Sequence, residues 1–285
     1  MWNASASAPV GLYRLVSDTR PRLGELVAIM PPTATARMMA ERHYRLPLRC
    51  AVWLGDTRVF VHTSDLHREI ELANAMSALG IKDFRFLAQG IKTYRDSGMM
   101  ETEPNNRPDV FWQADLEEAA DYLVAVIEEV KPHILITYDE IGGYGHPDHI
   151  QAHRVAMRAS EKSQWQIQKI YWNTIPKSVI AESMEKLKEI GSDFFGTENI
   201  DEIAFAKADE FIDALIDGNS YVEQKMAAMK AHHTQIALDG PFFALSNNLG
   251  LQVWGNEFYT LAKGEKAAPF DEAGRETDLF AGIIA

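Results

Sequence analysis

The spacing of hydrophobic residues predicts helices and strands clearly from about residue 66 to the C-terminus. Apolar side chains recur at helical spacing over residues 67–81 and 111–132, and Pro132 ends the second of these helices. Directly after it, residues 133–138 form a continuous apolar run of strand length. Such a run indicates a strand that is buried on both faces, as in a parallel sheet.

The remaining segments extend this alternation of helices and strands. Helical spacing returns at residues 148–161 and 221–235, and strand patterns occur at 83–88, 168–175, 208–218 and 257–264. The segment 208–218 alternates like an exposed edge strand. Strands that alternate with helices predict an α/β fold, here a Rossmann-like, mostly parallel sheet with flanking helices and a C-terminal extension.

The first 66 residues differ in composition from the rest of the chain. They contain eight arginines and no lysine, whereas the remainder contains seven arginines and thirteen lysines. They hold five of the 41 acidic residues, and their helical periodicity is poor. We therefore expect an atypical segment, residues 1–66, joined to an α/β unit, residues 67–285, within one domain.

Length and charge narrow the class of protein. A chain of 285 residues can bury a sizeable core. Its net charge of -13 argues against binding to nucleic acid, whose phosphates attract a basic surface. No apolar run reaches the length of a membrane span, the N-terminus lacks a signal-peptide pattern, and the single cysteine, Cys50, allows no internal disulfide. These features predict a cytoplasmic enzyme with a small substrate.

Metal-capable side chains gather directly after the apolar run, in the stretch "GGYGHPDHIQAH" at residues 142–153. In parallel α/β sheets, ligands bind beyond the carboxyl ends of the strands. The three glycines let the backbone turn sharply and approach a ligand. His146 and His149 are three residues apart at the start of the next helix, which places them on one side of its first turn.

The composition of this stretch favours a functional site over a structural one. A single histidine here would indicate no more than a polar helix cap. Two histidines and an aspartate within four residues, after a glycine loop, favour metal binding by one imidazole and proton transfer by the other. Asp148 can cap the helix or accept a hydrogen bond from a histidine ring, and His153 is expected to be a helix-face residue rather than a ligand.

Several stretches together resemble one known family. "GGYGHPDH" is similar to the second motif of the zinc-dependent N-acetylglucosaminide deacetylases of the LmbE/PIG-L family. "YRDSGM" (residues 94–99), "FWQADLEEAADYLVAVI", "GHPDHIQAHRVAMRA" and "AHHTQIALDGPFFALSNNLG" resemble the branch that removes acetate from N-acetylglucosaminyl-inositol in mycothiol biosynthesis. The resemblance runs from about Arg68 to the C-terminus and implies a deacetylase-like domain at residues 67–285.

The resemblance implies roles for residues of the second motif. It implies that His149 binds a single Zn²⁺ ion, and that His146 stabilises the oxyanion and protonates the leaving amine. Asp148 would orient His146, and Tyr144 would close over the substrate carbonyl. Gly145 stands where the sister branch, mycothiol conjugate amidase, typically has proline, which favours the deacetylase.

The resemblance also implies substrate-binding residues outside this motif. Arg68 and Asp96 match residues that hold the sugar and inositol hydroxyls. Taken alone, Arg68 would be read as part of a solvated helix face, and Asp96 as a turn-forming residue before "SG".

The family's first motif, Ala-His-Pro-Asp-Asp-Glu, does not occur in the sequence. It supplies two further zinc ligands and the general base, and it should lie within the first twenty residues. One hypothesis is that residues 1–66 are an out-of-frame translation of the usual segment, which the coding DNA would test. A weaker alternative takes His62 and Asp65 as metal ligands, with Ser64 in place of the base; otherwise Asp65 is a helix cap.

The leading prediction is a zinc-dependent deacetylase of N-acetylglucosaminyl-inositol. Zinc provides a water with a pKa of about 7 and polarises the carbonyl, and an imidazolium can donate the proton to the amine. The alternatives are a mycothiol conjugate amidase, a deacetylase of another N-acetylated sugar, and a catalytically impaired remnant with an incomplete zinc site. Neither a nucleic acid nor a membrane is expected as a partner, and the sequence leaves the oligomeric state open.

Overall fold

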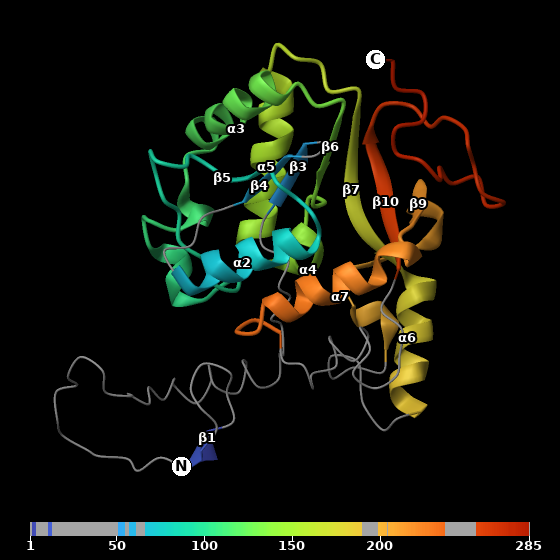
Figure 1. The fold of residues 1–285 in the computed structure, drawn as a ribbon, viewed down its shortest axis with the longest axis horizontal. Helices are drawn as coiled ribbons and strands as arrows, with labels where there is room; N and C mark the ends of the chain where they lie inside the picture. Colours follow the sequence, from blue (N-terminus) through green and yellow to red (C-terminus); the bar gives the residue numbers. More distant parts are fainter. Residues whose placement is uncertain are drawn as a thin grey trace.

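The structure is a computed structural model, and it describes residues 2–3, 11–12, 51–54, 57–60, 66–189, 199–203, 205–236 and 255–284. Within these residues, an eight-stranded mixed sheet is flanked by helices (Figure 1). The α/β class predicted from the sequence is therefore confirmed. The composition boundary at residue 66 stays a prediction, because most of residues 1–66 lie outside the described ranges.

The strands of the large sheet have the spatial order β5-β4-β3-β6-β7-β10-β9, and β8 pairs with β7. Their bounds are β3 (Ala51–Leu54), β4 (Thr57–Phe60), β5 (Phe84–Phe86), β6 (Ile134–Thr137), β7 (Lys169–Pro176), β8 (Ala206–Lys207), β9 (Ala214–Asp217) and β10 (Asn256–Lys263). A separate antiparallel pair consists of β1 (Trp2–Asn3) and β2 (Gly11–Leu12).

Most strands of the large sheet point in the same direction. The pairs β4–β5, β6–β7 and β7–β8 are parallel, whereas β3 and β10 are antiparallel to their neighbours. It follows that β4, β5, β6, β7, β8 and β9 share one direction, so the sheet is mixed with two reversed strands. The predicted edge strand is β9, which is shorter than expected because residues 209–211 form a 3-10 turn.

The helices follow the predicted pattern, except that those at residues 142–145 and 177–189 are additional and that the predicted helix at 111–132 begins with a separate 3-10 helix. Their bounds are α2 (Leu66–Ala78), α3 (Leu116–Val130), α4 (Gly142–Gly145), α5 (Pro147–Lys162), α6 (Lys177–Glu189) and α7 (Val222–Ala231). Short 3-10 helices are η1 (Glu103–Asn106), η2 (Phe111–Gln113), η3 (Ile200–Glu202), η4 (Asp209–Phe211) and η5 (Asn219–Tyr221). Helix α6 was not expected from the sequence, and it begins directly where β7 ends, without a connecting loop.

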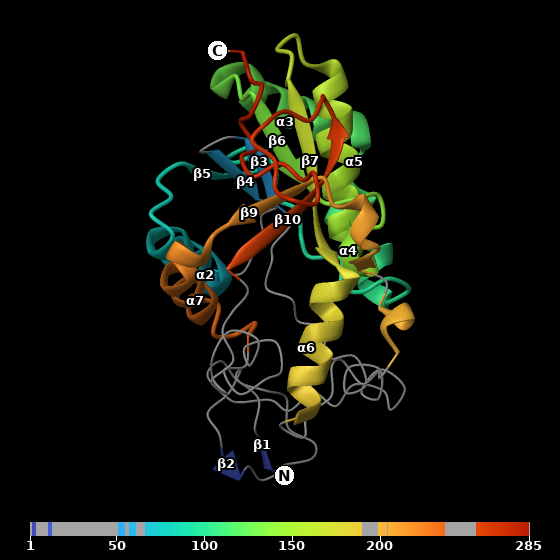
Figure 2. The ribbon, with the colours of Figure 1, turned by 90° about the vertical axis from the view of Figure 1, so that its right-hand side faces the viewer.

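Alternation along β4 separates two hydrophobic layers. Val59 faces the core formed with α3 and α5, whereas Phe60 packs with α2 and α7 on the opposite face. Figures 1 and 2 show α2 and α7 side by side, and α3 close to α5. The C-terminal segment covers β7, β9 and β10 through Leu279 and Ile283.

Local capping explains where the two central helices begin and end. The Asp115 side chain accepts a hydrogen bond from the Glu118 N–H and starts α3. Lys131 adopts the left-handed conformation after α3 (φ 51°), and Pro132 prevents continuation. His146 is the N-cap of α5 and Pro147 its first residue, a position that tolerates the missing proline N–H.

A buried ionic network attaches the C-terminal segment to the sheet. Glu276 is fully buried, and its carboxylate lies 2.5 Å from Lys169 Nζ and accepts a hydrogen bond of 2.6 Å from the Tyr171 hydroxyl. The Ala267 N–H donates a further hydrogen bond to it. Since a buried charge is tolerated where it is paired and hydrogen-bonded, this network fixes the segment after β10.

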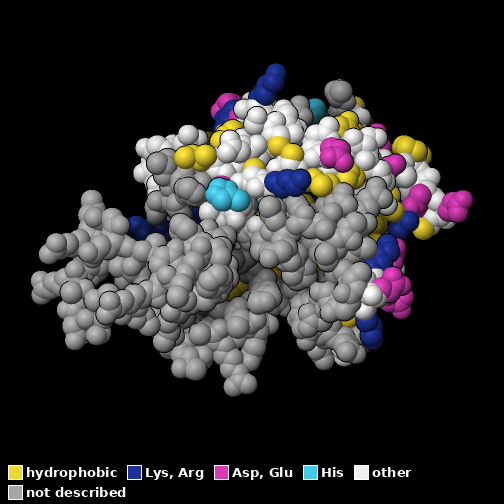
Figure 3. Space-filling model, turned by 60° about the horizontal axis from the view of Figure 1, so that its bottom comes forward, with side chains coloured by type: hydrophobic (Ala, Val, Ile, Leu, Met, Phe, Trp, Pro, Cys, Tyr) yellow, Lys and Arg dark blue, Asp and Glu magenta, His cyan; other side chains and the backbone are white. Residues whose placement is uncertain are grey.

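The described surface carries charges of both signs. On the face seen in Figure 3, the basic and acidic side chains of the described residues are scattered rather than gathered by sign. None of the described helices has the length and hydrophobicity needed to cross a membrane.

Candidate active site

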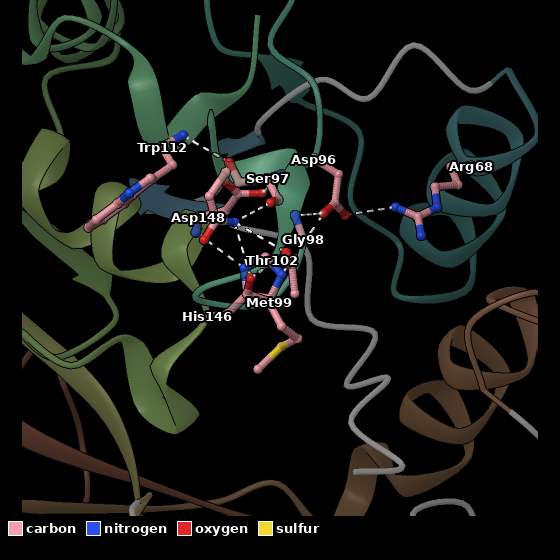
Figure 4. Close-up of polar contacts among 10 residues, drawn as sticks. Arg68, Asp96, Ser97, Gly98, Met99, Thr102, Trp112, His146 and Asp148 are labelled. Carbon is pink, nitrogen blue, oxygen red and sulfur yellow. Dashed lines mark hydrogen bonds and ion pairs between the residues drawn. The ribbon is translucent and has the colours of Figure 1, made fainter. Parts of the chain in front are cut away.

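The shared direction of β5 and β6 brings the predicted site residues to one edge of the sheet. Asp96 lies in the loop that follows β5, and the glycine loop with His146 and His149 follows β6. The carboxyl ends of strands with one direction meet at the same edge, where α/β proteins bind ligands. Arg68, in the first turn of α2, lies beside Asp96 (Figure 4).

The glycine loop, residues 142–145, approaches helix α5 closely because it lacks side chains at the contact. Gly142 has a φ of 65°, and a Cβ there would lie 2.6 Å from the Ile150 backbone nitrogen. A larger residue would therefore push the loop away from α5. Gly143 is also in the left-handed region, so α4 is a single irregular turn.

His146 and His149 lie together, and the ring of Tyr144 contacts both. The ring centroids of His146 and His149 are 5.0 Å apart, and the Tyr144 ring stands edge-on 5.0 Å from His149 and 6.1 Å from His146. His149 is buried, stacks on Tyr138 at 4.2 Å, and points its Nδ1 toward the Gly142 carbonyl at 3.2 Å. That carbonyl can only accept, so Nδ1 carries the proton and Nε2 carries the lone pair, which is the tautomer that an imidazole needs to bind a metal through Nε2.

Asp96 joins a basic group to the site. Its carboxylate accepts a hydrogen bond of 3.1 Å from Arg68 and one of 2.8 Å from the Gly98 N–H, and it lies 4.0 Å from His146 Nε2. Burial opposes ionisation, but His146, the Gly98 N–H and Arg68 together hold the pKa of Asp96 below its usual value. With 43% of its side chain exposed, the Asp96 carboxylate remains accessible to a polar ligand.

Asp148 is anchored to the loop that carries Asp96. Its carboxylate accepts hydrogen bonds from the Ser97 N–H (3.1 Å) and from the Ser97 hydroxyl, which in turn accepts one from the Trp112 N–H (Figure 4). The Asp148 main-chain N–H points at His146 Nδ1 at 3.1 Å. In this structure the main chain of Asp148 contacts the His146 ring, while its carboxylate holds the Ser97 loop.

Burial shifts the pKa values of His146 and Asp148 in the directions that favour the neutral form of each group. It lowers the pKa of His146; the nearby Asp96 opposes this shift and Arg68 adds to it. Burial, and then repulsion from the Asp96 carboxylate, raise the pKa of Asp148 from 3.8 to about 7, although the Ser97 hydrogen bonds oppose the shift.

The raised pKa of Asp148 predicts a loss of stability as pH rises. The folded state holds the Asp148 proton more tightly than the unfolded state does, so this group destabilises the fold progressively between about pH 4 and pH 7. Asp148→Asn resembles the protonated acid and lacks this titration. We expect its free energy of unfolding, relative to wild type, to rise by about 2.5 kcal/mol between pH 5 and pH 8.

Urea unfolding in metal-free buffer at both pH values measures this difference. Asp201→Asn serves as a control, because the Asp201 side chain is 74% exposed. An equal difference between wild type and Asp148→Asn at pH 5 and pH 8 would contradict the prediction.

A group of three residues and a neighbouring histidine could take part in metal binding. Ligand atoms of Asp96, His146 and Asp148 all lie within 4.8 Å of one another, close enough to hold a cation. Both carboxylates of this group are already engaged, however, by Arg68 and Gly98 in one case and by Ser97 in the other. His149 has the ring orientation of a metal ligand and lies next to this group.

The structure brings together six of the predicted residues: Arg68, Asp96, Tyr144, His146, Asp148 and His149. The alternative ligands His62 and Asp65 lie outside the described residues. His153 directs its Nδ1 to the Tyr138 carbonyl at 2.9 Å and packs against Trp172, as expected for a helix-face residue.

Sequence reasoning missed Ser97, which holds the Asp148 carboxylate. Its position directly after Asp96 in "YRDSGM" was the available signal. A serine before a glycine is common in turns, so the local sequence does not reveal a contact with a residue 51 positions away.

Taken together, the fold and the site define an α/β protein with a histidine and carboxylate site at the carboxyl ends of its parallel strands. A family model described as "PIG-L: GlcNAc-PI de-N-acetylase" matches residues 51–160. A relative from Catenulispora acidiphila is 50% identical over 229 residues, which cover 76% of this chain and 70% of that protein. The chain belongs to the PIG-L deacetylase family.

Further relatives carry the same description. A protein from Acidothermus cellulolyticus is 51% identical over 219 residues (76% of this chain, 74% of that protein), and one from Streptomyces griseus is 44% identical over 271 residues (92% and 78%). Both, like the Catenulispora protein, are named as a 1D-myo-inositol 2-acetamido-2-deoxy-alpha-D-glucopyranoside deacetylase.

A solved structure with some likeness is a conserved protein from Thermus thermophilus, with 14% identity and a TM-score of 0.42 over 75% of this chain and 84% of that one. A deacetylase from teicoplanin biosynthesis has 15% identity and a TM-score of 0.40, over 70% and 74% of the two chains. At these values the likeness bears on neither function nor ligands.

Proposed function

We propose that the site removes the acetyl group from an N-acetylglucosaminyl-inositol, a step of mycothiol biosynthesis that releases acetate. The convergence of Arg68, Asp96, His146 and His149 on one strand edge carries the proposal. Three relatives, 44–51% identical, are named for this deacetylation. We also propose a cytoplasmic location, as the composition predicts.

Arg68 and Asp96 suit a neutral polyol substrate. The guanidinium offers several donors, and the partly exposed carboxylate offers acceptors, so that a pair of neighbouring hydroxyls can bind to both. Their mutual ion pair leaves little net charge at this position. A sugar linked to inositol presents many hydroxyls and no charge, which fits this pair.

His146 is the proposed proton donor to the departing amine. Its lowered pKa makes the imidazolium a stronger acid, and Asp96 at 4.0 Å helps to stabilise the protonated ring. In the neutral ring Nδ1 accepts a hydrogen bond from the Asp148 N–H, and Nε2 faces Asp96; protonation of the ring would replace the bond at Nδ1. Tyr144, edge-on to the histidine rings, is proposed to donate to the substrate carbonyl.

His149 is the proposed zinc ligand, through Nε2. When bound, zinc supplies Lewis-acid polarisation of the acetamide carbonyl and a nucleophilic water at neutral pH. Catalytic zinc sites usually have three protein ligands, and the described residues provide one with a suitable orientation. The family's first motif does not occur in the sequence, and the alternative ligands His62 and Asp65 lie outside the described residues, which keeps an impaired remnant as the second candidate.

Amine release from two substrates tests this proposal and separates it from its same-class alternative. The substrates are N-acetylglucosaminyl-inositol and a mycothiol S-conjugate, each offered with Zn²⁺. They are given to the full chain and to a chimera whose residues 1–66 are replaced by the corresponding segment of the Acidothermus relative. We expect the chimera to prefer the acetylated sugar, in line with Gly145. If the chimera prefers the conjugate, the protein is an amidase. If the chimera releases amine from neither substrate, both assignments are rejected.

A further inference from the structure

The glycine loop that carries Tyr144 is held by the buried carboxylate of Asp139. Asp139 lies two residues after β6, and its side chain is 6% exposed. One carboxylate oxygen accepts a hydrogen bond of 2.8 Å from the Gly143 N–H, and its main-chain carbonyl accepts one of 3.0 Å from the Gly142 N–H. Asp139 thus fixes the first half of the loop, Gly142 and Gly143, by two hydrogen bonds.

The second carboxylate oxygen of Asp139 faces a lysine from a distant part of the chain. Lys207 Nζ lies 2.8 Å from Asp139 Oδ2. Lys207 belongs to β8, which pairs with the carboxyl end of β7, where Pro176 is opposite Lys207. The pairing of β8 with β7 therefore delivers a positive charge to the base of the loop.

The loop contains two further glycines with positive φ. Gly143 and Gly145 have φ values of 68° and 87°, and a Cβ at either position would meet no atom within 4 Å. Glycines in open space leave the backbone free to adopt other conformations. The contacts of Gly142 with α5 and of Gly143 with Asp139 therefore help to fix the conformation that places Tyr144 beside the two histidines.

We propose that Lys207 and Asp139 are positioning residues that hold the glycine loop, and with it Tyr144, over His146 and His149. The cation neutralises a carboxylate that would otherwise be buried without a counter-charge. Without Lys207, the buried Asp139 carboxylate would lack its counter-charge, and a rearrangement of its side chain toward solvent would weaken its bond to the Gly143 N–H. The role given to Tyr144 rests on the proposed function, whereas the geometry of the pair does not.

Amide hydrogen exchange of residues 139–146 in the full-length protein tests the pair without any measurement of turnover. Lys207→Met should raise the exchange rate at Gly143 about tenfold, which corresponds to ~1.4 kcal/mol of lost local stability. Lys207→Arg should preserve the slow exchange. Failure of the deacetylase assignment would leave these results unchanged, so the two proposals fail separately.

A matched control separates a local effect from general destabilisation. Lys225 has an exposure close to that of Lys207 and pairs with Glu257, between α7 and β10, where the carboxylate is more exposed than that of Asp139. Lys225→Met should change exchange at Gly143 less than twofold. An equal rise in both lysine variants, or a rise spread evenly over the protein in Lys207→Met, would overturn the proposal.

The double variant gives a second criterion. In Asp139→Asn the amide oxygen can still accept from Gly143, and the neutral side chain needs no counter-charge. Exchange at Gly143 in Asp139→Asn/Lys207→Met should therefore be slower than in Lys207→Met and close to that in Asp139→Asn. If the double variant exchanges as fast as Lys207→Met, the lysine does not act through the Asp139 carboxylate, and the proposal is wrong.

Discussion

Purified full-length protein is expected to bind zinc weakly and to deacetylate its sugar slowly or not at all. Tight binding comes from several preorganised ligands, usually three in a catalytic zinc site, and His149 alone is assigned with a suitable orientation. The general base of the first motif has no assigned replacement either. Loss of a general base typically costs about 10²–10⁴-fold in rate.

Zinc content and amine release of the full chain, compared with the chimera described above, measure this effect. The chimera should bind about one zinc per chain tightly and turn over at least 10²-fold faster, as a restored general base predicts. About one tightly bound zinc on the unaltered chain, with clear activity, would overturn the prediction. His62 and Asp65 would then be the first residues to substitute, and the coding DNA would show whether a shifted frame contains the missing motif.

In the chimera, substitution of His146 should affect turnover and substitution of His149 should affect zinc content. His146→Ala should slow turnover about 10²–10⁴-fold while zinc content stays unchanged, because a proton donor is lost without a ligand. His149→Ala should release zinc, because the imidazole whose Nδ1 faces Gly142 is removed. Equal zinc contents in the two variants would show that the roles are wrongly assigned.

A control for His146→Ala is His153→Ala on the same helix. His153 lies about two turns along α5 from His146, and its ring contacts Tyr138 and Trp172. It should lower stability, with zinc content and turnover per folded molecule little changed. A loss of turnover as large as that of His146→Ala would place His153 in the site.

Local sequence was sufficient for most elements and for the second motif. The helices α3 and α5 follow from apolar spacing alone, and the structure shows that Asp115 and His146, rather than Asp148, cap their N-termini. The stretch "GGYGHPDH" likewise places Tyr144, His146 and His149 together by spacing alone. Helix α6 was missed, although its residues are adequate helix formers, because no loop separates it from β7.

The tertiary structure decided the directions of the strands and the contacts between side chains that are far apart in the sequence. Apolar runs indicate strands, but nothing in a strand's own sequence states that β3 and β10 run against their neighbours. The Asp148 carboxylate meets Ser97 from 51 positions away, and Asp139 meets Lys207 from β8. Sequence patterns report the period with which a segment buries its own side chains. Which buried carboxylate meets which hydroxyl or cation depends on how the sheet orders its strands, and so on the packing of the whole chain.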